Sequence, residues 1–175
     1  GSEVSGPLNG NENLFVNKWS VIIKQKKSQT KEMKKILRFW KLLGSKTVTM
    51  DADQHDKIFA ITSHLPHLIA YNLILTATNF KSSNQNNILK FSAGGLRDFS
   101  RIAASNEIMW RDIFLSNKTN MLKVIDLFIN NLRIFKREIK QNKKNLEIKL
   151  KKLKKVRQKI ILLKQDTSKP DFGRI

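Results

Sequence analysis

The apolar positions between residues 19 and 50 follow two different spacings, which predict a strand, a helix and a second strand. Short apolar runs over residues 19–23 and 46–50 are typical of strands. Between them, apolar residues recur three and four apart from Thr30 to Leu43, as on the buried face of a helix, and Gly44 is suited to end that helix. The pattern predicts one βαβ unit. Because a parallel sheet normally extends over several strands, we expect the rest of it in sequence before residue 1.

Helical spacing takes over after residue 50, where we expect a second domain to begin. Asp51 or Asp53 is suited to cap a helix that runs to Thr62. Pro66 fits the first turn of a further helix, because its missing N–H is harmless there. We therefore expect a kink or short break at residues 63–66.

The second half of the chain predicts a loop, a turn and more helices. Residues 81–87 are polar and loop-like, the pair Gly94–Gly95 predicts a turn, and Ser105 is suited to cap the next helix. Helix is expected again from Asn117, and apolar residues at helical spacing continue almost to the C-terminus.

The pattern divides the chain into three parts. Residues 1–50 carry the βαβ unit, residues 51–165 form an all-helical domain, and residues 166–175 form a tail. Forty per cent of the 175 residues are hydrophobic, with only 3 Pro and 7 Gly, which is typical of a folded and regular chain. The predicted fold class is therefore mainly α.

The absence of cysteine excludes a disulfide framework, a thiol nucleophile and a cysteine-bound metal or iron–sulfur centre. This suits a reducing cytoplasm. No apolar run approaches the roughly 18 residues of a membrane span, and the chain does not open with a basic segment followed by an apolar one. We expect a cytoplasmic protein without a membrane partner.

The formal net charge of +20 raises nucleic acid as a partner. Lysine supplies 26 of the 34 basic residues, and Lys, Asn and Ile are all abundant, as expected from AT-rich coding DNA. The basic stretch over residues 139–164 has apolar residues at helical spacing and no aromatic residue that would stack on bases. Its lysines are interpreted as a solvated helix face, so no nucleic-acid partner is expected. Binding that falls steeply with salt would contradict this.

The segment Ser63-His64-Leu65-Pro66-His67 places two histidines on one helical turn. A metal site needs three or four ligands, and His55 is the only other histidine, so no metal is expected. The simpler interpretation is two half-buried histidines with satisfied hydrogen bonds. However, such a polar group before an apolar helix needs partners when buried, and a polar substrate could supply them.

A second constellation follows the glycine pair, where Arg97 and Arg101 lie four apart on a predicted helix. The planar guanidinium binds carboxylates through two hydrogen bonds, so either arginine could hold an organic acid. The alternative is that Asp98 simply pairs with one of them.

Several of these segments together make the chain resemble the prephenate dehydrogenase family, which includes the arogenate and cyclohexadienyl dehydrogenases of tyrosine biosynthesis. The similarity covers roughly residues 1–135, in the family's order and spacing. The matching segments are residues 1–6 (GSEVSG), 39–40 (FW) with 43–44 (LG), 55–56 (HD), 63–67 (SHLPH), 94–103 (GGLRDFSRIA), 109–113 (MWRDI) and Asn117.

The resemblance implies an enzyme that passes a hydride from a cyclohexadienyl acid to NAD+ or NADP+, with loss of carbon dioxide giving an aromatic ring. Prephenate would yield 4-hydroxyphenylpyruvate, and arogenate would yield tyrosine. In such enzymes an N-terminal Rossmann-type domain binds the cofactor, while a C-terminal helical domain forms a homodimer and completes the substrate cleft. The implied fold is an all-helical dimerisation and substrate domain preceded by a βαβ remnant of the nucleotide-binding domain.

The resemblance also implies roles for single residues. Arg101 would anchor a substrate carboxylate, and Glu3 would lie at the pocket mouth and pair with a basic residue such as Arg101. Ser63, His64 and His67 would line the pocket. The residues with supporting roles would be Arg97, Asp98 and Trp110.

No catalytic residue is expected in this chain, since the family's general base is a histidine in a His-Pro pair just before the Gly-Ser-Glu segment, and so upstream of residue 1. No GxGxxG spacing can be made from the 7 glycines, so NAD or NADP is expected to be bound mainly outside this chain. The chain alone is expected to be inactive. The alternative is a non-catalytic helical dimerisation module, in which replacing Arg101 would leave ligand binding unchanged.

Overall fold

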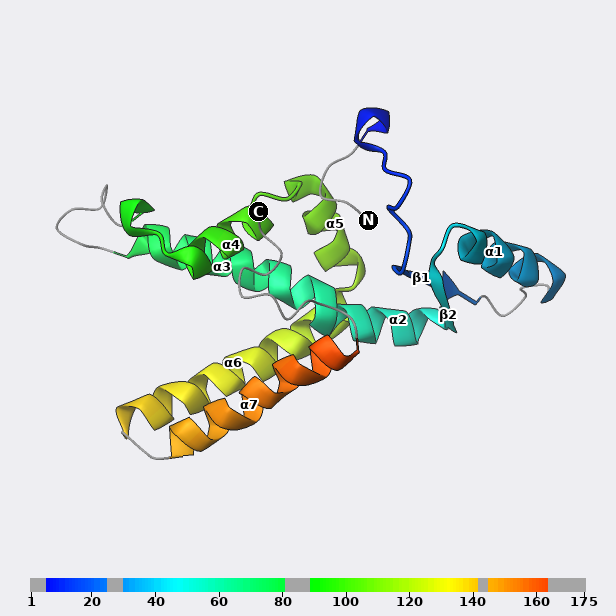
Figure 1. Cartoon of the computed structure of the whole chain (residues 1–175). Coiled ribbons are helices and arrows are strands. Elements are labelled where there is room, and N and C mark those ends of the chain that lie inside the picture. Colours follow the sequence, from blue (N-terminus) through cyan, green and yellow to red (C-terminus); the bar gives the residue numbers. More distant parts are fainter. Residues whose placement is uncertain (1–5, 25–29, 81–88, 142–144, 164–175) are drawn as a thin grey trace. The chain divides into compact units, whose positions relative to one another are not determined.

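The structure is a computed structural model of the chain and describes residues 6–24, 30–80, 89–141 and 145–163. Most of these residues lie in helices (Figure 1). The chain divides into two compact units, Gly1–Ile125 and Asp126–Ile175. The expectation of a mainly helical chain that opens with a βαβ unit is confirmed.

The βαβ unit follows a short 3₁₀ turn, η1 (Pro7–Asn9). β1 (Trp19–Ile23) and β2 (Lys46–Met50) pair in parallel, with Trp19 opposite Lys46 and Ile23 opposite Met50. α1 (Thr30–Leu42) connects the two strands and packs on β2. Among the described residues these two strands make up the whole sheet.

Gly44 ends α1 in a conformation that favours glycine. Its φ is +79°, in the left-handed region, and a Cβ there would lie 3.1 Å from Cγ2 of Val16. Its carbonyl accepts a hydrogen bond from the Asn17 N–H at 2.9 Å. The predicted helix end is therefore confirmed, and the same glycine ties α1 to the segment before β1.

One long helix follows β2, where a kink or short break at residues 63–66 was expected. α2 (Ala52–Phe59), the π-helical turn η2 (Ala60–His64) and α3 (Leu65–Asn79) are continuous. The expected break is wrong: in η2 the Leu65 N–H bonds to the Ala60 carbonyl, five residues earlier. Pro66 donates no N–H, and its ring crowds the carbonyl four residues back, so the wider π turn accommodates the proline.

By length and composition alone, this helix is able to cross a membrane. It has 28 residues, with an 18-residue window of mean hydropathy 1.4. The expectation that no such stretch occurs is corrected, because uncharged Ser, Thr, His and Asn interrupt the apolar residues without making the window polar. The helix supplies Ala60, Leu65 and Ala70 to the buried core, but only 17% of the window is buried, whereas core helices that pass the same test are mostly buried. The absence of a membrane partner stays a prediction.

α4 (Gly94–Ala103) and α5 (Glu107–Ser116) follow. α4 packs against α3, and the Tyr71 hydroxyl of α3 donates to the Ser105 carbonyl at 3.1 Å. Gly94 and Gly95 form the first turn of α4, so the separate turn expected there is wrong.

The cap of α5 is also corrected by one residue. Asn106 caps the helix, with its Oδ1 accepting from the Met109 N–H at 2.8 Å. The Ser105 hydroxyl instead donates back to the Ile102 carbonyl at 2.8 Å. Both side chains are good caps, so only the backbone path decides between them.

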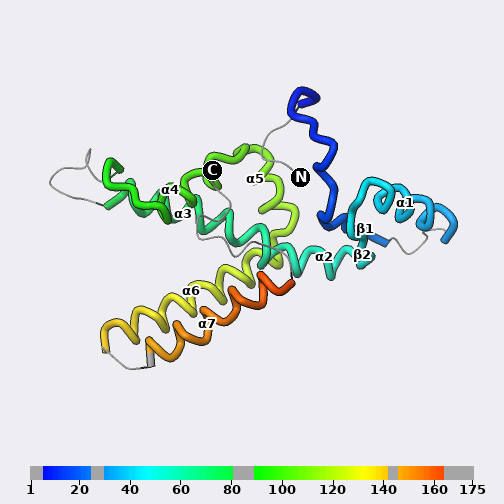
Figure 2. The backbone as a smooth tube through the Cα atoms, in the orientation of Figure 1, coloured from blue at the N-terminus to red at the C-terminus, as the bar shows by residue number. Residues whose placement is uncertain are grey.

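The second unit contains the later part of α6 (Lys118–Lys140) together with α7 (Asn145–Leu162), which lie side by side (Figure 1, Figure 2). Lys149 Nζ on α7 lies 2.5 Å from Glu138 Oε1 and 5.1 Å from the centroid of the Phe135 ring, both on α6. These contacts join the two helices.

Candidate functional site

The buried core of the first unit gathers around the histidine segment. Leu65 on α3, Trp110 on α5, Asn117 between α5 and α6, and Met121 on α6 each expose 7% or less of their surface. The fold therefore brings the segment of residues 63–67 against residues that are more than 40 positions away in sequence.

His67 lies flat against the buried indole of Trp110. The ring centroids are 3.6 Å apart and the planes are inclined by 20°. His67 Nδ1 lies 3.0 Å from the Ser63 carbonyl oxygen. Since a carbonyl only accepts, Nδ1 carries a proton and donates to it. The orientation of His67 is thus fixed by a stacked ring and a backbone hydrogen bond.

His64 lies one turn before His67 and meets the edge of the same indole, at a centroid distance of 6.2 Å and an interplanar angle of 76°. Burial lowers the pKa of His64 below its ordinary value of 6.5. The neighbouring His55 and His67 lower it further, whereas the Asp56 carboxylate opposes them. His64 is therefore neutral at neutral pH.

Asn117 lies at this site but was not among the site residues predicted from the sequence. Its Nδ2 donates to the Asp56 carbonyl at 2.8 Å and lies 3.3 Å from His64 Nδ1. Asn120 Nδ2 donates to Asn117 Oδ1 at 2.9 Å. Two features of the sequence could have pointed to Asn117. It belongs to the segments that resemble the family, and it is a polar residue at the junction of two helices with apolar faces.

His55 and Asp56 form the outer part of the cluster. His55 Nδ1 lies 2.9 Å from Asp56 Oδ1. The His55 ring stacks on the Phe59 ring, with the ring centroids 4.3 Å apart. Ser63 is half-buried, and its backbone carbonyl, rather than its hydroxyl, makes the described contact with His67.

The arginines lie on the neighbouring helix α4. Arg97 and Arg101 are exposed and Asp98 is half-buried. Because α4 packs against α3, the helix with the arginines lies beside the helix with His67. Glu3 lies outside the described residues. The structure thus brings His64, His67 and Trp110 together, and places Arg101 on an adjacent helix.

Metal binding finds no support in the described part of the chain. No group of three or more His, Cys, Asp or Glu side chains there is placed to hold an ion. His55, Asp56 and His64 lie near one another, but Asn117 engages His64 Nδ1.

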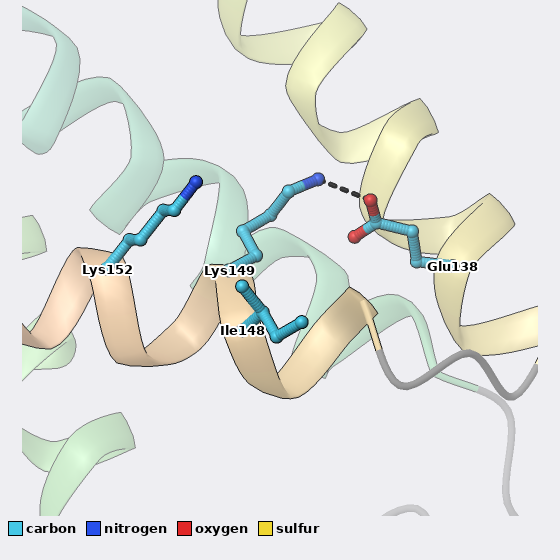
Figure 3. A pocket seen from close by; sticks show the side chains of 4 residues that line it. All are labelled: Glu138, Ile148, Lys149 and Lys152. Atoms are coloured by element: carbon cyan, nitrogen blue, oxygen red, sulfur yellow. Dashed lines mark hydrogen bonds and ion pairs between the residues drawn. The ribbon is translucent and has the colours of Figure 1, made fainter.

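A hollow of about 240 Å³ lies in the second unit, lined by Glu138, Ile148, Lys149 and Lys152 (Figure 3). Lys149 spans it to reach Glu138 Oε1, while Glu138 Oε2 is buried with no partner among the described residues. None of its four residues belongs to the candidate site, and we assign it no chemistry.

The connection from β1 to α1 does not have the sequence of a dinucleotide-binding turn. The connection from β1 to α1, residues 24–29, reads KQKKSQ and has no glycine. A phosphate-binding turn in a βαβ unit needs glycines, so that the backbone can approach the pyrophosphate closely. A dinucleotide is therefore not expected to bind at this connection.

The site lies within the part of the chain that matches a known family. The family model described as "Prephenate dehydrogenase, dimerization domain" matches residues 51–155. The chain belongs to the prephenate dehydrogenase family. The match includes the residues around the two histidines, which are His55, Asp56, Ser63, His64, His67, Trp110 and Asn117. It also includes Arg97, Asp98 and Arg101 on α4.

Two named dehydrogenases with similar sequences support this family membership. The chain is 35% identical to the cyclohexadienyl dehydrogenase of Zymomonas mobilis subsp. mobilis over 133 residues, which are 76% of this chain and 45% of that protein. It is 32% identical to the prephenate dehydrogenase of Bacillus subtilis over 132 residues, which are 75% of this chain and 35% of that protein. The chain therefore spans less than half the length of these two relatives.

Solved structures of the family share the fold. The prephenate dehydrogenase from Aquifex aeolicus, in complex with hydroxyphenyl propionate and NAD+, matches with a TM-score of 0.85 and 36% identity, over 91% of this chain and 56% of that one. The Synechocystis arogenate dehydrogenase matches in fold, with a TM-score of 0.75 and 23% identity, over 84% of this chain and 54% of that one. The predicted family and fold class are both confirmed.

Proposed function

We propose that this chain is the substrate-binding and dimerisation part of an NAD(P)-dependent prephenate dehydrogenase, which oxidises and decarboxylates prephenate to 4-hydroxyphenylpyruvate in tyrosine biosynthesis. The observation that carries the proposal is the cluster in which half-buried His64 and His67 contact buried Trp110 and Asn117 inside the family match. Arogenate dehydrogenase is the second candidate, since a fold neighbour bears that name. In the division proposed here, residues 1–50 belong to the nucleotide-binding domain, residues 51–165 to the helical domain and residues 166–175 to a tail.

In this proposal Ser63, His64 and His67 line the substrate pocket. A neutral His64 offers a hydrogen bond without adding a charge, and the stack on Trp110 holds His67 in one orientation. Arg101 anchors a substrate carboxylate through its planar guanidinium. Glu3 closes the pocket mouth, with Arg97, Asp98 and Trp110 as supporting residues.

The cofactor and the general base are proposed to lie outside these 175 residues. The Aquifex aeolicus relative was solved with NAD+, and this chain lacks the glycine-rich turn that such a cofactor requires. By this proposal the chain's own residues bind and orient the substrate, while hydride transfer depends on the rest of the protein.

The partner of this chain in the proposal is a second copy of itself. The family model is that of a dimerization domain, and many large apolar side chains in the matched region are exposed, among them Leu75, Ile108, Leu115 and Leu132. A cytoplasmic location, with neither membrane nor nucleic acid as a partner, completes the proposal.

The test is the formation of reduced nicotinamide by the gene product that contains this chain, with prephenate and arogenate as alternative substrates and NAD+ and NADP+ as alternative cofactors. Oxidation of prephenate by the gene product, and no oxidation by the 175-residue chain alone, is the expected result. No oxidation of either acid by the gene product would reject a dehydrogenase function and favour the non-catalytic dimerisation module.

Arg101 is tested in the same protein. Arg101→Ala is expected to weaken prephenate binding roughly 10- to 100-fold, which corresponds to the loss of one hydrogen-bonded charge. Arg133→Ala, which removes an exposed arginine on α6 that has no role in the proposed pocket, is the matched control and is expected to change binding by less than about 3-fold. Unchanged binding in Arg101→Ala would reject the role of Arg101.

A further inference from the structure

The position of Asn117 is fixed by the backbone on both sides of its side chain. It ends α5, with its N–H bonded to the Ile113 carbonyl at 3.1 Å, and its own carbonyl accepts from the Met121 N–H of α6 at 3.0 Å. With only 7% of its surface exposed, its amide must find partners inside the protein.

The two ends of the Asn117 amide are distinguished by their neighbours. Nδ2 lies 2.8 Å from the Asp56 carbonyl oxygen, which only accepts, and Oδ1 lies 2.9 Å from Asn120 Nδ2, which only donates. An amide turned by 180° would place Oδ1 against the Asp56 carbonyl oxygen, acceptor against acceptor, and turning the Asn120 amide as well would not relieve this. The NH₂ group therefore faces Asp56 and His64.

Asn117 Nδ2 carries two hydrogens, and one of them bonds to the Asp56 carbonyl. The other is available to His64 Nδ1, which lies 3.3 Å from Nδ2. Because an amide nitrogen cannot accept, His64 Nδ1 must offer its lone pair. The single proton of the neutral ring then lies on Nε2.

We infer that Asn117 is a positioning residue that holds His64 in its neutral Nε2–H form, so that His64 acts at Nε2 as a hydrogen-bond donor. His67 has the opposite arrangement at Nδ1, which donates to the Ser63 carbonyl. The Nδ1 atoms of two histidines one helical turn apart thus have opposite hydrogen-bonding roles. The relevance to substrate rests on the proposed function: His64 would donate to a substrate oxygen and would not take a proton through Nε2.

The charges around His64 agree with this assignment. His55 and His67 disfavour a positive charge on the ring, Asp56 favours one, and burial disfavours it most. A second proton on His64 would have to sit on Nδ1, against the N–H of Asn117, so the amide opposes protonation for a geometric reason as well.

The experiment is nitrogen NMR of the histidine rings in the 175-residue chain, which needs neither substrate nor cofactor. For His64 we expect one protonated nitrogen, Nε2, and a pyridine-like Nδ1 at neutral pH. A proton on His64 Nδ1 in the unmodified chain would overturn the inference. A missing dehydrogenase activity would leave the NMR result unaffected, so failure of the proposed function is distinguishable.

Asn117→Asp replaces the donor with an acceptor of the same shape. The proton of His64 is expected to move to Nδ1 and the titration midpoint of His64 to move to higher pH. Asn130→Asp, an exposed change of the same charge on α6, is the control and should alter neither. If Asn117→Asp does not fold, Asn117→Ala decides: His64 should become a mixture of both neutral forms. An unchanged pure Nε2–H form in the folded variant would overturn the role of Asn117.

Discussion

Trp110 illustrates how one side chain organises its surroundings. It is 5% exposed, stacks on His67 and meets His64 edge-on. Its ring also packs against Phe114, with the two ring centroids 5.5 Å apart. Its Nε1 is buried without a hydrogen-bond partner among the described residues. The ring of Trp110 therefore stabilises the fold through the apolar area that it buries, whereas burying its N–H without a partner among the described residues costs free energy.

The contribution of the ring is tested by two substitutions. Trp110→Ala is expected to lower the free energy of unfolding by about 3–5 kcal/mol, because it leaves a cavity beside His67. Trp110→Phe keeps an aromatic face and removes the unpartnered N–H, so a loss of less than about 2 kcal/mol is expected. Urea unfolding measures both, and equal losses would contradict a role based on ring stacking.

The lowered pKa of His64 predicts a dependence of stability on pH. The unfolded chain binds a proton at His64 near the ordinary pKa of 6.5, whereas the folded protein does so only at lower pH. The contribution of His64 to stability is therefore complete above pH 6.5 and is lost as the pH falls through the lowered value. His64→Gln should show less loss of stability between neutral and acid pH than the unmodified chain, and an equal loss would reject this origin.

At the scale of elements, the start of α2 separates two aspartates that the sequence treated as equivalent. Asp51 Oδ1 accepts from the Gln54 N–H at 2.7 Å and caps the helix, whereas Asp53 makes an exposed ion pair with Lys57 at 2.6 Å. Asp51→Ala is expected to lower the free energy of unfolding by about 1 kcal/mol. Asp53→Ala should lower it by less than about 0.5 kcal/mol. Thermal unfolding of both variants tests the assignment, and the reverse order would contradict it.

The pair of helices in the second unit depends on a partly buried charge. Glu138 exposes 14% of its side chain and Lys149 33%, whereas the pair of Glu147 and Lys151 is about 70% exposed on both sides. Lys149→Met should lower stability by roughly 1–3 kcal/mol, because it leaves the carboxylate without its cation. Lys151→Met is the control and should cost less than about 0.5 kcal/mol. Equal effects on urea unfolding would show that the contact between α6 and α7 does not depend on this pair.

At the scale of the whole molecule, the described residues bury few large apolar side chains. The buried hydrophobic residues number five, while thirty large hydrophobic residues are exposed. Such an excess of exposed apolar surface favours association with a partner. We expect sedimentation equilibrium to give a dimer that persists at high salt, since apolar contacts are not screened. A monomer over the whole concentration range would contradict the proposed homodimer.

Local spacing along the chain was enough to predict the first elements of the fold. The strands of residues 19–23 and 46–50, the helix between them and its stop at Gly44 follow from apolar periodicity and from one backbone position that favours glycine. The family also followed from the sequence, because its matching segments lie in order along the chain. Of the kink or short break expected at residues 63–66, the break is wrong, because a π turn directly before Leu65 accommodates Pro66 without interrupting the helix. No local sequence pattern predicts such a turn.

Tertiary structure alone decided which side chains meet. The choice of Asn106 over Ser105 as a cap depends on backbone direction, since both residue types cap helices well. The contacts of Asn117 reach residues 53 and 61 positions away, so no local spacing could reveal that its amide faces His64 and Asp56. The sequence supplied two histidines on one helical turn. Only the packing of the α5–α6 junction against that turn brought Asn117 to His64 and so fixed which nitrogen of the His64 ring carries the proton, because the hydrogen bond at one ring nitrogen decides the tautomer.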